Sequence, residues 1–257
     1  MRSALAVLAA SIGAFCATLP AAAADTAAEE AAEAVATAAE TPIQPEPAAD
    51  SGAILVTPET AAVADWVIAS GDNRSLPFAI IDKVAAEVLV FSPDGELLGK
   101  APVLIGLSRG DDSAPGVGDK KLSAITAEEK TTPAGRFLAA YGPAPGGRKV
   151  LWVDYATAIS LHPVVTNNPK EQRTRRIKSP SPEDNRITYG CINVPAAFYQ
   201  KVVQPAFKGD GGVVYVLPEA KPLEQVFPAI GFFHTANSAT EHQTSASAGP
   251  PRATLAE

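Results

Sequence analysis

Residues 78–105 read FAIIDKVAAEVLVFSPDGELLGKAPVLI, and this stretch determines how the domain is expected to begin. Residues 78–81 and 87–91 are short apolar runs that predict β-strands. Residues 92–95, Ser-Pro-Asp-Gly, predict a turn, because proline presets the backbone angle of a turn corner and glycine accepts a conformation that other residues resist. Residues 96–105 are then the expected returning strand. The stretch therefore predicts a β-hairpin that opens a β-rich domain.

Further strands and two helices are expected around this hairpin. Apolar runs predict three more strands, at residues 149–153, 158–162 and 212–217. Thr57 and Pro58 are typical of a helix start, and Gly71 of its end. A second helix is expected from Pro195 to about Gln204, and its expected buried positions are Phe198, Val202 and Val203. Mixed strands with two peripheral helices predict a mainly β or α+β fold.

The two ends of the chain differ from this domain in composition. Residues 1–24 combine Arg2, an apolar run and an Ala-x-Ala end, which predicts a cleavable secretory signal peptide, with an uncleaved anchor as the alternative. Residues 25–52 are rich in alanine, glutamate and proline and predict a disordered linker. A disordered tail is expected at 235–257, which leaves one domain at 53–234. The expected location is the periplasm or the outside of the cell envelope.

Charge is concentrated in the linker. Residues 25–50 hold seven of the 28 acidic residues and no basic residue, so the rest of the chain is nearly neutral although the formal net charge is −7. A neutral domain without interleaved basic and aromatic residues does not suggest nucleic-acid binding. Three phenylalanines near the end of the domain are expected to pack against its core, with a partner surface as the alternative: Phe227, Phe232 and Phe233.

One cysteine remains if the signal peptide is removed. Cleavage takes away Cys16 and leaves Cys191, so no intramolecular disulfide can form. A lone thiol in an oxidising compartment is either a buried core residue or a functional one. If Cys191 uses a histidine base from the domain core, His162 is the one available, because His234 and His242 lie beyond the last predicted strand.

A cysteine needs such a partner to act as a nucleophile. A free thiol has a pKa near 8.5, and a neighbouring imidazolium stabilises the thiolate. The following helix would add the positive end of its dipole. Gly190 would let a substrate approach the backbone, whose amides could stabilise an oxyanion. The alternatives are a His162 satisfied by a backbone carbonyl and an Asn193 that caps a helix or closes a turn rather than orienting a neighbour.

The sequence resembles L,D-transpeptidase catalytic domains in several ordered segments. Thr188-Tyr189-Gly190-Cys191-Ile192-Asn193 is similar to their signature of Ser/Thr-His-Gly-Cys, an apolar residue and Asn/Arg. Leu161-His162 resembles the upstream histidine element, and residues 132–137, Thr-Pro-Ala-Gly-Arg-Phe, resemble a Thr-Pro-x-Gly-x-Phe segment. With the opening hairpin, the resemblance covers residues 78–217. It implies a β-sandwich of the L,D-transpeptidase type with peripheral helices.

The resemblance also implies a reaction. Cys191 would attack the carbonyl between the third and fourth residues of a peptidoglycan stem peptide and form a thioester. The acyl group would then pass to an unidentified amine acceptor, or to water in a carboxypeptidase or amidase. His162 would be the base, oriented by a backbone carbonyl near Pro163, and the Gly190 and Cys191 amides would form the oxyanion hole. No metal or organic cofactor is implied. A non-catalytic peptidoglycan-binding protein is the alternative from another class.

Two features depart from the family pattern. Tyr189 stands where the family has histidine, and a phenol does not readily take a proton near pH 7, so this position is expected to shape the pocket. The segment between His162 and Cys191 is longer than usual and basic; its basic residues are Lys170, Arg173, Arg175, Arg176, Lys178 and Arg186. It is either a solvated surface or a lid on which Arg173, Arg175 and Arg176 bind acidic groups of the stem peptide.

Overall fold

The computed structural model describes residues 56–144 and 148–233. The expected signal peptide, the linker, the C-terminal tail, His234 and His242 lie outside the described residues. None of the helices in the described part of the chain is long and apolar enough to cross a membrane.

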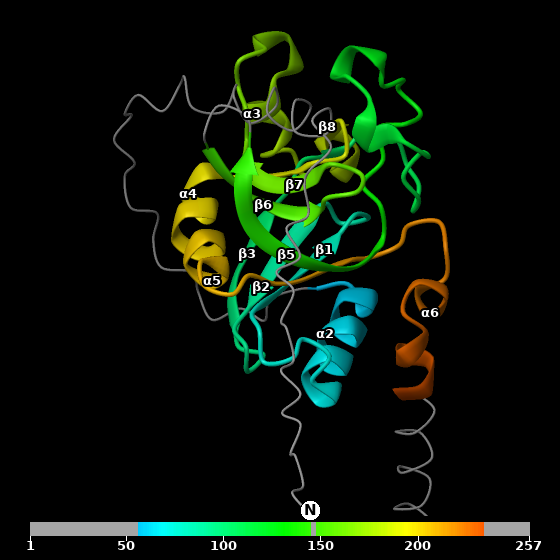
Figure 1. The fold of residues 1–257 in the computed structure, drawn as a ribbon, viewed down its shortest axis with the longest axis vertical. Helices are drawn as coiled ribbons and strands as arrows, with labels where there is room; N and C mark the ends of the chain where they lie inside the picture. The colour runs from blue at the N-terminus through cyan, green and yellow to red at the C-terminus, as the bar shows by residue number, and fades with distance from the viewer. Residues whose placement is uncertain (1–55, 145–147, 234–257) are drawn as a thin grey trace, which may run out of the picture.

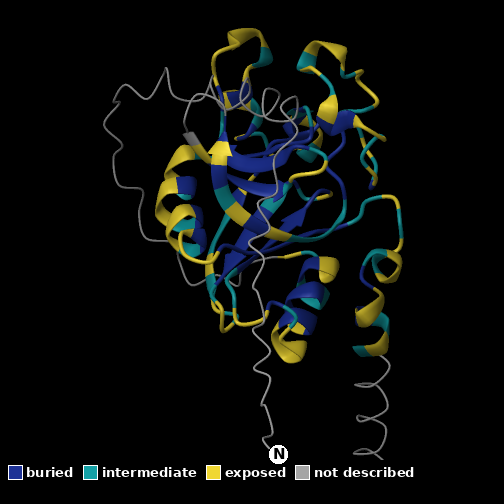
Figure 2. Cartoon of the chain, viewed as in Figure 1, coloured by how far each residue is buried: buried dark blue, intermediate teal, exposed yellow. Residues whose placement is uncertain are grey.

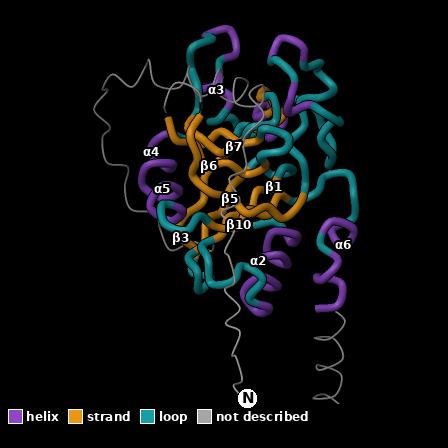
Figure 3. Tube along the Cα trace, in the orientation of Figure 1, coloured by secondary structure: helices purple, strands orange, loops and turns teal. Residues whose placement is uncertain are grey.

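The described chain is a β-rich domain with short helices around it (Figures 1 and 3). Its strands are β1 (Phe78–Asp82), β2 (Glu87–Phe91), β3 (Leu97–Pro102), β4 (Ile105–Gly106), β5 (Gly135–Ala144), β6 (Arg148–Asp154), β7 (Ile159–Pro163), β8 (Arg186–Thr188), β9 (Ile192–Val194) and β10 (Gly212–Val216). Its α-helices are α2 (Pro58–Ser70), α3 (Arg173–Arg176), α4 (Ala196–Phe198), α5 (Gln204–Phe207) and α6 (Leu223–Val226). Short 3-10 helices are η2 (Val117–Asp119), η3 (Leu122–Ala124), η4 (Pro169–Glu171) and η5 (Pro182–Asn185).

Eight strands form one mixed sheet whose two edges almost meet. Their order is β3-β2-β1-β10-β5-β6-β7-β9, with the pairs β1–β10 and β7–β9 parallel and the others antiparallel. Just beyond β3, Leu104 exchanges two backbone hydrogen bonds, of 2.8 and 2.9 Å, with Asn193 on β9. β4 then pairs in parallel with β8 in a small second sheet. The large sheet therefore curls into a nearly closed barrel.

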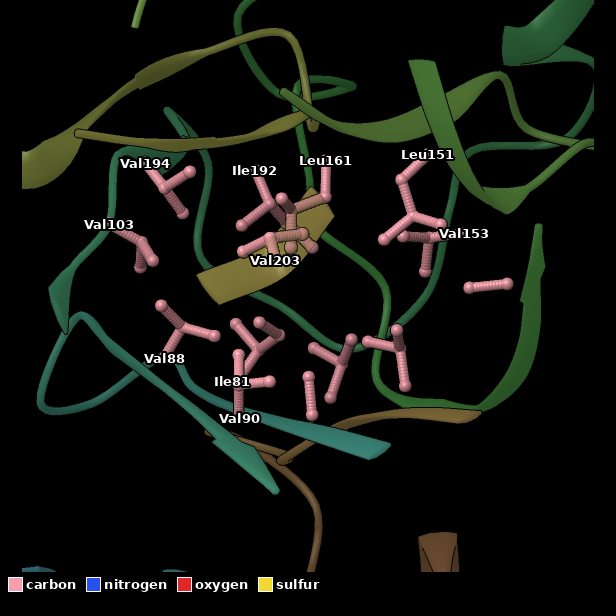
Figure 4. Packing of buried hydrophobic residues seen from close by; sticks show 14 of the residues in the cluster. Ile81, Val88, Val90, Val103, Leu151, Val153, Leu161, Ile192, Val194 and Val203 are labelled. Atoms are coloured by element: carbon pink, nitrogen blue, oxygen red, sulfur yellow. The ribbon is translucent and has the colours of Figure 1, made fainter. Parts of the chain in front are cut away.

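The main core fills the space inside the curled sheet. Figure 4 shows Leu161 and Ile192 from one half of the sheet facing Ile81, Val88 and Val90 from the other half. Helix α4, the π-helical turn η6 (Tyr199–Val203) and α5 cover one end of this core with three buried residues: Tyr199, Val203 and Phe207. The two halves thus form opposing layers around one apolar interior.

A second core explains why the opening hairpin is apolar at consecutive positions. Ala79 and Ile81 of β1 point into the barrel, whereas Phe78 and Ile80 point outward against α2 and the segment around α6. Both faces of the strand are therefore buried, as the dark strands in Figure 2 illustrate. α2 begins where Thr57 accepts a side-chain hydrogen bond from the backbone N–H of Thr60 and ends at Gly71, whose positive φ of 67° suits glycine.

The structure confirms the predicted fold class and most predicted elements. The mainly β fold with peripheral helices is present, and the helix that starts at Pro195 continues past Gln204 to Phe207. Among the described residues, the sequence did not predict β5, β8 or β9, and the single strand expected at 96–105 is divided into β3 and the start of β4. The prediction was also wrong for Phe232, which is 79% exposed, whereas Phe227 and Phe233 do pack against the second core.

Candidate active site

The parallel pairing of β7 and β9 places four polar side chains on one face of the sheet. Leu161 lies opposite Ile192, and His162 lies opposite Asn193. Because side chains alternate along a strand, Leu161 and Ile192 point into the barrel core while their neighbours point away from it. The neighbours are Ser160 and His162 on β7, together with Cys191 and Asn193 at β9. The structure therefore brings the two residues chosen from the sequence, Cys191 and His162, onto the same face of adjacent segments.

The Cys191 thiol is buried among polar groups. The residue is 4% exposed, its Sγ lies 3.6 Å from Ser160 Oγ, and it donates a long hydrogen bond of 3.7 Å to the carbonyl oxygen of Ala158. Ser160 lies in the strand predicted at residues 158–162, but its contact with the thiol was not predicted. The sulfur thus has hydroxyl and carbonyl neighbours at hydrogen-bonding range, rather than a purely hydrocarbon environment.

The turn before Cys191 is held by hydroxyl groups. Thr188 Oγ1 donates to the carbonyl oxygen of Cys191 at 2.6 Å and accepts from the Gly190 N–H at 3.1 Å. Thr132 Oγ1 donates to the carbonyl oxygen of Gly190 at 2.8 Å. The Gly190 amide is therefore already hydrogen-bonded, and it can donate to an oxyanion only if this bond opens or is shared.

Gly190 is required by both conformation and space. Its φ is +122°, and an added Cβ would lie 2.7 Å from the carbonyl oxygen of Thr131 and from Ile159 Cδ1. Residues other than glycine rarely adopt such a φ. Segment 131–132 thus packs directly against the turn that presents Cys191, which gives the Thr-Pro-x-Gly-x-Phe segment a structural role.

His162 is buried and hydrogen-bonded at both ring nitrogens. It is 1% exposed, its Nδ1 lies 2.8 Å from the carbonyl oxygen of Pro163, and its Nε2 lies 3.1 Å from Asn193 Nδ2. The expected backbone carbonyl that orients the ring is therefore that of Pro163 itself. Asn193 also contacts the ring and does not cap the following helix, whose N-cap position is Pro195.

The helix expected to assist Cys191 does not reach it. β9 lies between Cys191 and the start of α4 at Ala196. A helix dipole acts within about one turn of its terminus. The predicted contribution of this helix to thiolate stability was therefore wrong.

The three arginines chosen as substrate ligands fall into two groups. Arg173 is 6% exposed and donates from Nη1 to Asn193 Oδ1 at 2.9 Å. Arg175 is exposed and Arg176 half-buried, and both line a cavity of about 450 Å³ with Lys178. The structure thus brings Arg173 to the sheet face of Cys191 and His162. This contact could not be predicted, because a position within a basic run is typical of a surface residue.

Tyr189 lies beside the turn and binds a cation through its ring. Lys130 Nζ is 3.8 Å from the centre of the Tyr189 ring, and the tyrosine is half-buried. This contact is consistent with a residue that shapes its surroundings. In the described part of the chain, no three His, Cys, Asp or Glu side chains are grouped so that they could hold a metal ion.

The described chain is thus a curled mixed β-sheet that carries a cysteine–histidine pair on its outer face. Its fold is similar to the catalytic domain of the L,D-transpeptidase from E. faecium, with a TM-score of 0.33 and 17% identity over 55% of this chain and 95% of that one. It is also similar to the helical cell shape determining protein Pgp2 from Campylobacter jejuni, with a TM-score of 0.37 and 16% identity over 62% of this chain and 56% of that one.

An L,D-transpeptidase from Mycobacterium smegmatis is similar as well, with a TM-score of 0.31 and 20% identity over 55% of this chain and 58% of that one. The match therefore spans little more than half the length of Pgp2 and of the mycobacterial protein. No protein-family model matches the sequence, and a comparison with curated proteins finds no match. These likenesses concern the fold alone.

Proposed function

We propose that this protein is a cysteine acyltransferase that acts on peptidoglycan stem peptides, an L,D-transpeptidase. The observation that carries the proposal is the shared sheet face of Cys191 and His162, with the thiol among polar groups. The motif Thr-Tyr-Gly-Cys-Ile-Asn at 188–193 supports the same assignment. A cysteine with a neighbouring base that a third group orients is the general arrangement for nucleophilic catalysis.

The reaction proceeds in two steps. Cys191 Sγ forms a bond to the carbonyl carbon between the third and fourth residues of the stem peptide while its proton passes to His162 Nε2, whose contact with Asn193 Nδ2 opens in this step. The carbon–nitrogen bond then breaks, the terminal D-amino acid leaves with that proton, and a thioester remains on Cys191. In the second step the nitrogen of an amine acceptor attacks the thioester, His162 takes its proton, and the thiol of Cys191 is regenerated.

Supporting groups have defined tasks in this scheme. The carbonyl of Pro163 holds Nδ1 of the imidazole, so that Nε2 remains the basic nitrogen. The backbone amide of Cys191 serves the oxyanion, and the Gly190 amide joins it when its bond to Thr188 opens. Arg175 and Arg176 bind acidic groups of the stem peptide. The proposal includes action in the cell envelope, where crosslinking contributes to cell-wall biogenesis and cell shape, and involves no cofactor.

Two other functions remain as outcomes of the test. A hydrolase would use the same nucleophile and base but pass the acyl group to water. A non-catalytic peptidoglycan-binding protein would bind the stem peptide without a covalent step. Neither is favoured by a specific contact of the described residues.

The test is a measurement of intact mass after incubation with a tetrapeptide stem. We expect an adduct that lacks the terminal D-amino acid and that is absent in Cys191→Ala, with Cys16→Ser as the control for the other thiol of the chain. Addition of an amine acceptor should then yield a crosslinked product; release of free acid alone would identify a hydrolase. Binding without an adduct would contradict acyl transfer and identify a binding protein.

A further inference from the structure

Arg173 is a buried cation that reaches the catalytic face from the basic segment. Its guanidinium is 6% exposed and donates from Nε to Glu171 Oε2 at 2.5 Å and from Nη1 to Asn193 Oδ1 at 2.9 Å. Asn193 is fully buried, and its Nδ2 lies 3.1 Å from His162 Nε2. A continuous chain of contacts therefore runs from Glu171 through Arg173 and Asn193 to the imidazole.

The donor and acceptor roles along this chain leave one consistent arrangement. A guanidinium has only donors, so the Asn193 atom that faces Arg173 must be the oxygen. The amide NH₂ group then faces His162, and because it can only donate, Nε2 must present its lone pair. Nδ1 faces the carbonyl of Pro163, which can only accept, so Nδ1 carries the ring proton. These contacts select a neutral imidazole with its proton on Nδ1.

The surroundings of His162 combine neutral and charged groups. Cys191, immediately before β9, shares its sheet face, and Cys191 Sγ lies 3.7 Å from the carbonyl oxygen of Ala158, an acceptor that suits a thiol. Asn193 connects the ring to Arg173, which pairs with Glu171 in the basic segment, and Ser160 on the same strand as His162 is neutral. A thiol and a neutral base fit these contacts.

We propose that Arg173 is a positioning residue, which fixes the Asn193 amide so that its NH₂ group faces His162 Nε2 and holds the imidazole in the neutral form with a proton on Nδ1. The inference rests on the proposed function for the role of His162 as base. An imidazolium would place an N–H against the NH₂ group, whereas an amide freed from Arg173 could rotate and offer its oxygen to that N–H. Arg173 therefore keeps the imidazole unprotonated at rest, and Nε2 can accept the proton of Cys191 once its contact with Asn193 opens.

The experiment is an NMR titration of the histidine ring signals of the full-length protein without substrate. His162 is assigned with His162→Gln, and the signals of His234 and His242 by substitution of each. Arg173→Met should raise the pKa of His162 by about 1 unit or more, because the rotated amide then stabilises the imidazolium. Arg173→Lys, which keeps a cationic donor, should raise the pKa of His162 by less than Arg173→Met does. Arg175→Met, a neighbouring exposed arginine, should leave the pKa unchanged.

A second pair of variants, made in an Asn193→Leu protein, separates a positioning role of Arg173 from direct repulsion between its charge and that of the imidazolium. Removal of a nearby cation would by itself raise the pKa of His162, but that effect would persist when Asn193 is absent. In an Asn193→Leu background we expect Arg173→Met to cause no further shift. An equal shift in both backgrounds, or an unchanged His162 in a folded Arg173→Met protein, overturns the proposal.

The titration remains decisive if Arg173→Met does not fold, and it does not depend on detecting a stem-peptide adduct. If Arg173→Met does not fold, Asn193→Asp tests the same geometry, since a carboxylate has no N–H to offer and should raise the pKa of His162; an unchanged value would overturn the proposal. The titration uses no substrate, so it can succeed even if the stem-peptide adduct is never seen. Conversely, adduct formation with an unshifted His162 would refute only the role of Arg173.

Discussion

Thr132 and Gly190 are joined by a buried hydrogen bond of 2.8 Å, from Thr132 Oγ1 to the carbonyl oxygen of Gly190. The same hydroxyl oxygen accepts a bond of 2.9 Å from the backbone N–H of Gly106. One side chain therefore ties the segment after β3 to the turn that presents Cys191. The backbone of Thr132 is held in turn by Lys83, whose Nζ donates to its carbonyl at 3.0 Å.

Replacement of Thr132 by valine should destabilise the protein. The substitution leaves the Gly190 carbonyl and the Gly106 N–H without their partner, and each unsatisfied buried group costs about 1–3 kcal/mol. We expect the free energy of unfolding in urea to fall by about 2–4 kcal/mol. Thr132→Ser keeps the hydroxyl and should lose about 1 kcal/mol or less. Equal losses in the two variants would show that the methyl group contributes as much as the hydroxyl, and an unchanged Thr132→Val would contradict the role of the two hydrogen bonds.

Gly190→Ala should be more harmful than a glycine substitution where space is open. At Gly190 an added Cβ meets the carbonyl oxygen of Thr131 at 2.7 Å, in addition to the strain of a φ of +122°. We expect a loss of about 3 kcal/mol and a slower reaction at Cys191. Gly116 has a positive φ of 70° and no atom within 4 Å of an added Cβ, so Gly116→Ala should cost about 1 kcal/mol. Similar unfolding energies for both would contradict a tight fit at Gly190.

The sequence predicted the hairpin well because both faces of β1 and β2 are buried, which makes their apolar runs continuous. β5 escaped prediction although it lies in the centre of the sheet. Its sequence, Gly-Arg-Phe-Leu-Ala-Ala-Tyr-Gly-Pro-Ala, has no long run of large apolar residues and contains Gly142 and Pro143 near its end, which are typical of a turn. Its neighbours in the sheet are β10, which is distant in sequence, and β6, which follows after a loop. The pairing that makes β5 a strand is therefore not visible in its own sequence.

The candidate site also contains residues that could be predicted from the sequence and residues that could not. Cys191 and His162 could be chosen from the sequence because a nucleophile requires a base and the chain has three histidines. Arg173 could not be separated from its basic neighbours, because its burial depends on an Asn193 oxygen that only the fold brings within 2.9 Å. The buried ion pair of Lys83 and Asp111, with 2.8 Å between Nζ and Oδ1, was likewise missed, since isolated charges carry no periodic pattern.

Asp111 should contribute acid-sensitive stability. Burial alone would raise its pKa, but its hydrogen bonds to Lys83 and to the backbone N–H groups of residues 219–221 outweigh burial and lower the pKa from 3.8 to about 2. A lowered folded-state pKa stabilises the fold above the unfolded value, by about 2 kcal/mol here, and this contribution is lost as the pH falls from about 4 through 2.

Urea unfolding at pH 7, 4 and 3 tests this contribution. Asp111→Asn should be less stable than wild type at pH 7, because Lys83 is left buried with its 2.8 Å partner neutralised. It should also lose less stability than wild type between pH 4 and 3. Asp112→Asn, at a neighbouring exposed carboxylate, should follow the wild-type curve. Parallel curves for Asp111→Asn and wild type would contradict the lowered pKa.

Tyr189 should act through its ring and not through its phenol. The Lys130 Nζ atom lies 3.8 Å from the ring centre, a contact that needs only the aromatic face. Tyr189→Phe should therefore change the rate of adduct formation at Cys191 by less than about twofold, whereas Tyr189→Leu should lose about 0.5–1 kcal/mol of stability. Complete loss of adduct in Tyr189→Phe would instead assign the hydroxyl a direct part in the reaction.

The cavity of about 450 Å³ beside α3 should bind acidic groups of the substrate. Arg176 donates to the carbonyl oxygens of Glu171 and Asp184, at 2.9 and 3.0 Å, and Arg175 donates to the side-chain oxygen of Gln172 at 3.1 Å. Because these partners are neutral oxygens, the positive charge of the two arginines is not compensated by them. A carboxylate entering this cavity would gain charge-assisted hydrogen bonds.

The variant that tests this cavity must spare the buried Arg173. We expect Arg175→Gln combined with Lys178→Gln to raise the KM for stem peptides by about 3- to 30-fold, which corresponds to about 1–2 kcal/mol, with kcat little changed, because the residues bind ground state and transition state alike. Lys201→Gln combined with Lys208→Gln changes the net charge equally, at one exposed position in η6 and one just after α5, and should leave KM unaltered. An equal rise in KM in the two double variants would show that the overall charge of the protein, and not the cavity, determines the effect. No rise in either would mean that the basic segment is a solvated surface, with Arg173 its only residue tied to the site.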